Sequence, residues 1–123
     1  MKAVTRILFL DEQQEKFFGE GPYRLLAGIE ETGSLHQSAI AMGMAYSKAL
    51  KLIKHAEKAL GFPLTHRTTG GISGGGSRLT PQGKEWIEKY AAYRNACVDA
   101  NRRLYLEFFP EQREEAPVSD GNP

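Results

Sequence analysis

Lysine, arginine and hydroxyl side chains gather in the middle of this 123-residue chain, and such groups are suited to contact with a polyanion. Between residues 34 and 80 the sequence has six Lys and Arg residues and a single acidic residue, Glu57. The remainder has four more acidic than basic residues, so the formal net charge of +1 conceals a basic middle between acidic flanks. This division indicates a local surface for a polyanion. The alternative is that the lysines form only the solvated face of a helix.

A glycine-rich run over residues 70–77 shares some features with a phosphate-binding loop. Gly71 and Gly76 have the spacing of a Walker A motif, but Ser77 and Arg78 stand where that motif needs Lys and then Ser or Thr. No strand-loop-helix context surrounds the run, so nucleotide hydrolysis is not expected. As a loop between two strands, the same glycines let backbone amides approach phosphate groups closely.

The chain has few groups for catalysis or metal binding. His36, His55 and His66 do not have a metal-ligand spacing, so we expect structural histidines rather than ligands. The single cysteine, Cys97, excludes an internal disulfide and a cysteine-rich zinc site. No pair of nucleophile and base is visible. We therefore predict no catalytic residues, no metal, no cofactor and no enzyme activity.

Two helices joined by a tight glycine turn are predicted to position the basic residues. The sequence Ser34–Gln37 has the form of a capping box and predicts a helix that Gly43 ends. A second helix is predicted over residues 45–60, ended by Gly61. Its buried stripe is Ala49, Ile53, Ala56 and Leu60. Its other face carries Lys51, Lys54 and Lys58. A second helix that is basic on its exposed side matches a helix-turn-helix.

A hairpin and a helix are predicted before this pair. Residues 4–10 are β-branched, aromatic and aliphatic and predict a strand, with residues 15–18 as its returning partner. The sequence Gly19–Pro22 breaks the chain and opens a helix, because proline suits the first helical turn. That helix ends at Thr32, with Gly33 as a left-handed cap.

A glycine-tipped hairpin and a long helix are predicted after the pair. Residues 65–69 and 78–80 predict two strands, which form a wing. Thr80 as N-cap and Pro81 at the first helical position begin a helix that extends to Phe109. Its apolar residues recur every three or four positions, at Trp86, Tyr90, Tyr93, Cys97, Ala100, Leu104 and Phe108. This stripe is suited to a second helix, although packing on its own domain is an alternative.

The predicted fold class is mainly α with small β: a winged helix-turn-helix with an N-terminal β-hairpin and a long C-terminal dimerisation helix. The winged helix-turn-helix is assigned to residues 1–80, with N-terminal strands at 3–18 and the wing at 67–80. The dimerisation helix is assigned to residues 81–109 and a disordered tail to residues 110–123. No signal peptide or membrane span is visible, so a cytoplasmic location is expected.

Three segments resemble the N-terminal domain of the ModE family, the molybdate-responsive transcriptional regulators related to LysR-type winged helices: residues 30–34, 43–49 and 67–83. The most specific of these is the Thr-Gly-Gly-x-x-Gly-Gly-Gly wing followed by Leu-Thr. The similarity covers roughly residues 3–105. The resemblance implies a homodimer that binds a pseudo-palindromic operator.

Two departures from the family limit what the resemblance implies. The family usually has Ser where Ala45 stands, so a helix N-cap typically worth about 1 kcal/mol and a DNA contact are missing. The chain also ends where the molybdate-binding domains would begin. We therefore expect a stand-alone DNA-binding half without the oxyanion sensor.

The prediction is a transcriptional regulator that binds double-stranded DNA as a homodimer. The predicted DNA contacts are Ser34, Tyr46, Ser47, Lys48, Lys51, Lys54, Arg67, Thr68, Thr69, Gly74, Gly75, Ser77 and Arg78. The predicted dimer interface comprises Trp86, Tyr90, Tyr93, Cys97, Leu104 and Phe108. An alternative of another class is a protein-interaction module, in which the long aromatic helix recruits a separate sensor protein and DNA binding is secondary.

Overall fold

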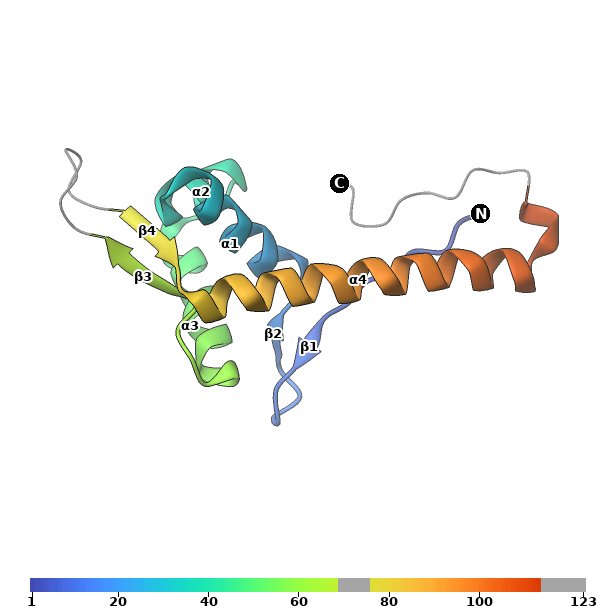
Figure 1. Cartoon of the computed structure of the whole chain (residues 1–123), viewed down its shortest axis with the longest axis horizontal. Coiled ribbons are helices and arrows are strands. Elements are labelled where there is room, and N and C mark those ends of the chain that lie inside the picture. The colour runs from blue at the N-terminus through green and yellow to red at the C-terminus, as the bar shows by residue number, and fades with distance from the viewer. Residues whose placement is uncertain (69–75, 114–123) are drawn as a thin grey trace. The chain divides into compact units, whose positions relative to one another are not determined.

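The computed structural model describes residues 1–68 and 76–113 (Figure 1). Leu8–Glu88 forms one compact unit, and Met1–Ile7 with the chain from Lys89 onward forms a second. The long helix α4 (Pro81–Phe108) begins in the first unit and continues in the second. Within the described ranges, no helix is long and apolar enough to cross a membrane.

Three helices form the centre of the first unit: α1 (Glu20–Thr32), α2 (Leu35–Ala41) and α3 (Tyr46–Leu60). Glycines in the left-handed conformation end two of them, with φ of 75° at Gly33 after α1 and 83° at Gly61 after α3. An L-residue with a side chain rarely adopts such angles, whereas glycine does so without steric cost. The predicted boundaries of all three helices are confirmed to within a few residues.

The predicted capping box of α2 is only half correct. Ser34 Oγ accepts the N–H of Gln37 at 3.0 Å, as predicted. The N–H of Ser34, however, donates to Thr32 Oγ1 at 3.2 Å rather than to the Gln37 side chain. Thr32 stands two residues before Ser34 at the end of α1, so its hydroxyl supplies a nearer acceptor than the side chain of Gln37.

The core of this unit lies where the three helices meet. Its fully buried apolar side chains are Phe18, Leu25, Leu26, Ile29, Ala39, Ala49, Ile53, Ala56 and Leu64. The stripe predicted for α3 is confirmed at its first three positions, whereas Leu60 is half-buried. The helices α1 and α2 approach closely at Gly28, where any Cβ atom would collide with Ser38 Oγ. That hydroxyl donates to the Leu25 carbonyl at 2.8 Å, so a buried polar group is satisfied.

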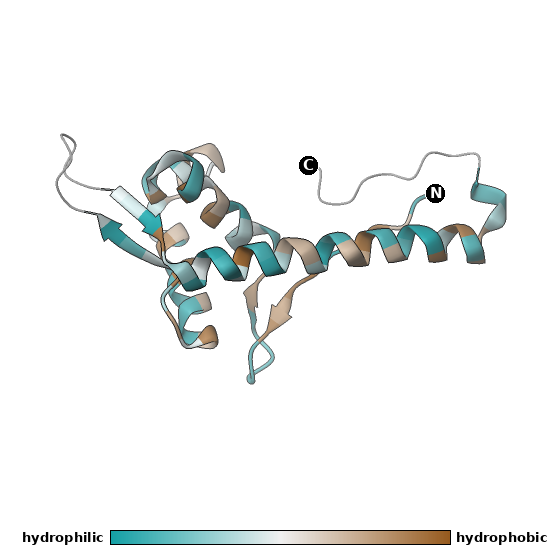
Figure 2. Ribbon diagram, in the orientation of Figure 1, coloured by the Kyte–Doolittle hydropathy of each residue, from teal (hydrophilic) through white to brown (hydrophobic). Residues whose placement is uncertain are grey.

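A short antiparallel hairpin precedes α1, formed by β1 (Phe9–Leu10) and β2 (Lys16–Phe18). Its strands are coloured as hydrophobic and its connecting turn as hydrophilic in Figure 2. Asp11 Oδ1 holds the turn by accepting the N–H groups of Gln13 and Glu15, both at 2.9 Å. The bond from the Glu15 N–H is the main reason why the pKa of the Asp11 carboxyl lies below its ordinary value.

The prediction of a strand over residues 4–10 is wrong for residues 4–8. In the second unit, Met1, Thr5 and Ile7 bond to side chains of α4, and this segment pairs with no strand of the described residues. Tyr90 Oη donates to the Ile7 carbonyl at 3.0 Å, and Asn101 Nδ2 donates to Thr5 Oγ1 at 2.6 Å. Tyr105 Oη donates to the Met1 carbonyl at 2.9 Å. These bonds hold an extended segment in place without a β partner.

The wing is an antiparallel hairpin of β3 (Thr65–Thr68) and β4 (Gly76–Leu79). Its two strands confirm the predicted hairpin, although β4 begins two residues earlier than the sequence predicts. The N–H of Ser77 donates to the Gly33 carbonyl at 2.9 Å, which ties β4 to the end of α1. The predicted glycine tip lies outside the described residues.

The helix α4 begins as the sequence predicts. Thr80 Oγ1 accepts the Gly83 N–H at 2.9 Å as an N-cap and donates to the Pro63 carbonyl at 2.6 Å. The helix ends at Phe108, one residue earlier than expected, and Pro110–Gln112 forms a short 3-10 helix, η1. The tail was predicted to begin at residue 110, and its part from 114 onward lies outside the described residues.

Candidate nucleic-acid interface

The helix α3 exposes every one of its residues that the sequence predicts as a DNA contact. These are Tyr46, Ser47, Lys48, Lys51 and Lys54. The helix follows a tight turn, in which Gly43 has a φ of 64° and the Met44 N–H donates to the Ala39 carbonyl at 2.9 Å. The opposite face of α3 is buried in the core. The residues that follow the turn, at the amino-terminal end of α3, are exposed to solvent.

One lysine of this face has an acidic neighbour. Lys54 Nζ lies 3.5 Å from Glu57 Oε1, and the Lys54 side chain is 70% exposed. Ion pairs at this exposure contribute little to stability. The other Glu57 oxygen, Oε2, accepts the N–H of Leu64 at 2.7 Å and that of Thr65 at 3.4 Å. The single acidic side chain of the basic middle is therefore held by the backbone that leads into the wing, while Lys54 remains exposed to a polyanion.

The two arginines of the wing lie on opposite faces of its ribbon. Arg67 pairs with Ser77 and His66 pairs with Arg78 across the two strands. Residues directly opposite each other share a face, and successive residues of a strand alternate between faces. Arg67 therefore shares a face with Ser77, whereas Arg78 shares the other face with His66.

Residues from both faces of the wing border a hollow of about 150 Å³ at its base, here called the wing-base hollow: Arg67 and Ser77 from one face, Thr68 and Gly76 from the other. Its lining comes from the start of α2, the start of α3 and both wing strands. The lining residues are Ser34, Leu35, His36, Tyr46, Arg67, Thr68, Gly76 and Ser77. The structure thus brings together Ser34, Tyr46, Arg67, Thr68 and Ser77 from the predicted set.

The chemistry of the wing-base hollow suits a phosphate group. Thr68 Oγ1 accepts the Gly76 N–H at 3.0 Å, and Ser34 Oγ likewise accepts a backbone N–H. A hydroxyl that accepts one hydrogen bond still has its own proton to donate. Together with the guanidinium of Arg67, these hydroxyls supply the charge and the donors with which proteins bind phosphate oxygens.

Other predicted contacts lie elsewhere. Lys48, Lys51, Lys54 and Arg78 do not line the wing-base hollow. Thr69, Gly74 and Gly75 lie outside the described residues. Sequence reasoning missed His36, whose ring centroid lies 5.9 Å from that of Tyr46. Its position two residues after the N-cap of α2 was the available signal.

The aromatic stripe of α4 divides into a packed part and an exposed part. Trp86 packs against Phe9 and Phe18 in its own unit, with ring centroids 5.6 and 5.2 Å apart. Tyr90 is only 2% exposed. Tyr93, Leu104 and Phe108 are 51%, 51% and 71% exposed, and Cys97 is half-buried. The exposed part leaves large apolar side chains in contact with solvent.

A helix-turn-helix followed by a two-stranded wing defines the winged helix-turn-helix class of regulatory proteins. Residues 23–84 match the family described as "Bacterial regulatory helix-turn-helix protein, lysR family". The chain belongs to this lysR family of bacterial regulatory helix-turn-helix proteins, which confirms the predicted fold class and type of protein.

Curated relatives that are similar to the chain share the name ModE. The chain is 32% identical over 90 residues to "Transcriptional regulator ModE" of Haemophilus influenzae, covering 73% of this chain and 35% of that protein. It is 34% identical over 90 residues to "Molybdenum transport protein ModE" of Herbaspirillum seropedicae, covering 73% and 30%. It is 34% identical over 84 residues to "DNA-binding transcriptional dual regulator ModE" of Escherichia coli, covering 68% and 32%. The predicted ModE resemblance is confirmed, and the chain spans about a third of the length of these relatives.

Proposed function

We propose that this chain regulates transcription by binding operator DNA as a homodimer. The observation that carries the proposal is the wing-base hollow, in which hydroxyls and an arginine converge beside the exposed lysine face of α3. In this arrangement α3 is the recognition helix and lies in the major groove, while the wing lies along the adjacent DNA backbone. The wing-base hollow binds one phosphate group of that DNA backbone.

Within the recognition helix, two kinds of contact are assigned. Ser47 lies in the first turn of α3 and reaches a base edge. Lys48, Lys51 and Lys54 neutralise phosphates on either side of the groove. Tyr46 lines the wing-base hollow, so its hydroxyl is assigned to the same phosphate as Arg67.

Dimer formation is assigned to the exposed part of α4. This part of the helix exposes the large apolar side chains of Tyr93, Leu104 and Phe108. In the proposed dimer, a second copy of the helix packs against these side chains. A twofold arrangement would place two recognition helices one helical turn of DNA apart. Trp86 and Tyr90, the other aromatic residues of the predicted interface, are packed within the single chain.

DNA binding is tested by fluorescence anisotropy on genomic duplexes selected by the wild-type chain. Lys51→Ala/Lys54→Ala is expected to weaken binding and to reduce the slope of log affinity against log salt by about two units, since each phosphate contact contributes about one. The matched control is Lys2→Ala/Lys16→Ala, which removes the same charge from two exposed lysines outside the basic middle. Equal affinities for the two double variants would contradict the assignment of α3.

Dimer formation is tested by sedimentation of the same samples. The wild type is expected to sediment as a dimer, and Leu104→Glu as a monomer with unchanged helical content. A monomeric wild type would overturn the homodimer and favour the other predicted function, in which the exposed aromatic face recruits a different protein.

A further inference from the structure

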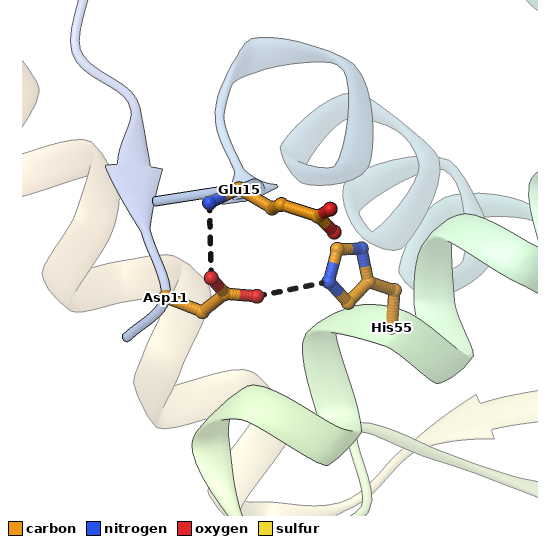
Figure 3. Close-up of side chains that lie close together, drawn as sticks. All are labelled: Asp11, Glu15 and His55. Atoms are coloured by element: carbon orange, nitrogen blue, oxygen red, sulfur yellow. Dashed lines mark hydrogen bonds and ion pairs between the residues drawn. The ribbon is translucent and has the colours of Figure 1, made fainter. Parts of the chain in front are cut away.

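Three side chains with metal-binding atoms converge away from the wing-base hollow, as Figure 3 shows. Asp11 and Glu15 flank the turn between β1 and β2, and His55 comes from α3. One potential ligand atom from each of the three lies within 4.8 Å of the other two. Among residues 1–68 and 76–113, this is the only group of three such side chains that lies so close together.

One distance in the Asp11–Glu15–His55 cluster matches the separation of two ligands in a tetrahedral metal site. His55 Nε2 lies 3.4 Å from Asp11 Oδ2, which is longer than the common 2.7–3.2 Å of an N–H···O hydrogen bond. Two ligands on one tetrahedral Zn²⁺ ion, with bonds of about 2.0–2.2 Å, are separated by about 3.3–3.5 Å. The Asp11–His55 distance is therefore close to one edge of such a tetrahedron. Glu15 is the third candidate ligand, because one of its carboxylate oxygens lies within 4.8 Å of the ligand atoms of both other residues.

The backbone of the turn orients the aspartate. Asp11 Oδ1 accepts the N–H groups of Gln13 and Glu15, so this oxygen is fully used by the turn. The other oxygen, Oδ2, is left directed at His55 (Figure 3). A carboxylate fixed in this way resembles the hydrogen-bonded ligands of structural metal sites, whose orientation is set before the ion arrives.

The surroundings favour a cation. The cluster lines a groove of about 650 Å³ whose charged side chains are Asp11, Glu12, Glu15 and Lys58, with His55 beside them. Three carboxylates against one ammonium group give this groove a negative potential, opposite in sign to the lysine face at the start of α3. The groove is open to solvent, so water can complete the coordination of an ion.

We propose that Asp11, Glu15 and His55 bind a divalent transition-metal ion of the Zn²⁺ type. The imidazole ligand favours such an ion over Ca²⁺ and Mg²⁺, which prefer six or more oxygen ligands. The bound ion would join the β1–β2 turn to the carboxyl-terminal half of α3. The inference concerns a site separate from the proposed DNA contacts and stands whether or not they are correct.

The experiment is calorimetric titration of the full chain with Zn²⁺, with Mg²⁺ and Ca²⁺ as separate arms. One Zn²⁺ ion per chain is expected, together with a rise in Tm, because an ion that binds only the folded state stabilises it. Neither Mg²⁺ nor Ca²⁺ is expected to bind comparably. His55→Gln and Glu15→Gln are each expected to weaken Zn²⁺ binding at least tenfold.

Two control variants distinguish this site from adventitious binding. Glu12→Gln removes a carboxylate from the same groove but not from the cluster, and His66→Gln removes an exposed imidazole from the wing. Both are expected to bind Zn²⁺ as the wild type does. Asp11→Asn retains an oxygen that can accept the turn hydrogen bonds, so it should fold yet bind Zn²⁺ weakly. Absence of Zn²⁺ binding, or equal losses in His55→Gln and His66→Gln, would overturn the site.

Discussion

The described residues contain two antiparallel hairpins with opposite surroundings. The β1–β2 hairpin is apolar, buries Phe18 completely and packs Phe9 against Trp86. The wing is polar, exposes Arg67 and Arg78, and is tied to α1 through backbone atoms. The first hairpin thus stabilises its unit, whereas the wing presents charge to solvent. The two hairpins differ in the side chains on their faces and in their strands, which are shorter and shifted in register between Phe9 and Leu10 in the first hairpin.

The largest expected effect comes from removing the apolar anchor of the first hairpin. Phe18→Ala is expected to lower the free energy of unfolding by about 3–5 kcal/mol, because a fully buried aromatic ring is lost and a cavity remains. Urea denaturation followed by circular dichroism measures this change. The corresponding substitution in the wing, His66→Ala, is expected to change stability by less than about 0.5 kcal/mol. Equal effects of the two substitutions would remove the proposed distinction between the hairpins.

A smaller effect separates the two faces of the wing. Arg67→Ala is expected to weaken DNA binding about tenfold, which corresponds to about 1.4 kcal/mol, and to lower the salt slope by about one unit. Arg78→Ala is expected to have a smaller effect, because Arg78 does not line the wing-base hollow. Anisotropy titrations at several salt concentrations measure both, with urea denaturation as the check on folding. A greater loss for Arg78→Ala would contradict the assignment of the phosphate contact to Arg67.

The smallest expected effect concerns α3, which contributes residues to both the wing-base hollow and the groove beside the first hairpin. Its N-cap, Ala45, is extended with φ −64° and ψ 143° and makes no side-chain cap hydrogen bond. Ala45→Ser is therefore expected to raise the free energy of unfolding by about 0.5–1 kcal/mol. Thermal and urea unfolding measure this gain, and Ala41→Ser, at an exposed position within α2, is the control that should give none. A loss of stability in Ala45→Ser would show that a serine at this position cannot act as the cap.

Local signals made most of the helical framework predictable. Gly33 follows α1, Gly43 lies in the turn between α2 and α3, and Gly61 follows α3. Each of these glycines has a positive φ. The Thr80–Pro81 pair begins α4 as expected. Each of these signals acts within about four residues, so the chain order alone reveals it.

Features that depend on distant residues were not predictable. The strand expected over residues 4–8 is absent from the described structure because Tyr90, Asn101 and Tyr105 hold this segment from far along the chain. Likewise, His55 and Asp11 meet across 44 positions. The periodicity of α4 showed that one face is apolar, but it could not show that Trp86 and Tyr90 pack within their own chain. Periodicity identifies a face and leaves its partner unspecified.

The contact between Gly33 and Gly76 has a consequence for how DNA preference can change. Any Cβ atom at residue 76 would collide with the Gly33 carbonyl, and the adjacent Ser77 N–H donates to that same oxygen. The wing is therefore attached to the end of α1 by a main-chain hydrogen bond. This contact uses no side chain from the exposed faces of α3 or of the wing, so substitutions there leave it in place. Under the proposed function, those side chains can change the preferred DNA sequence while the wing stays attached to the end of α1.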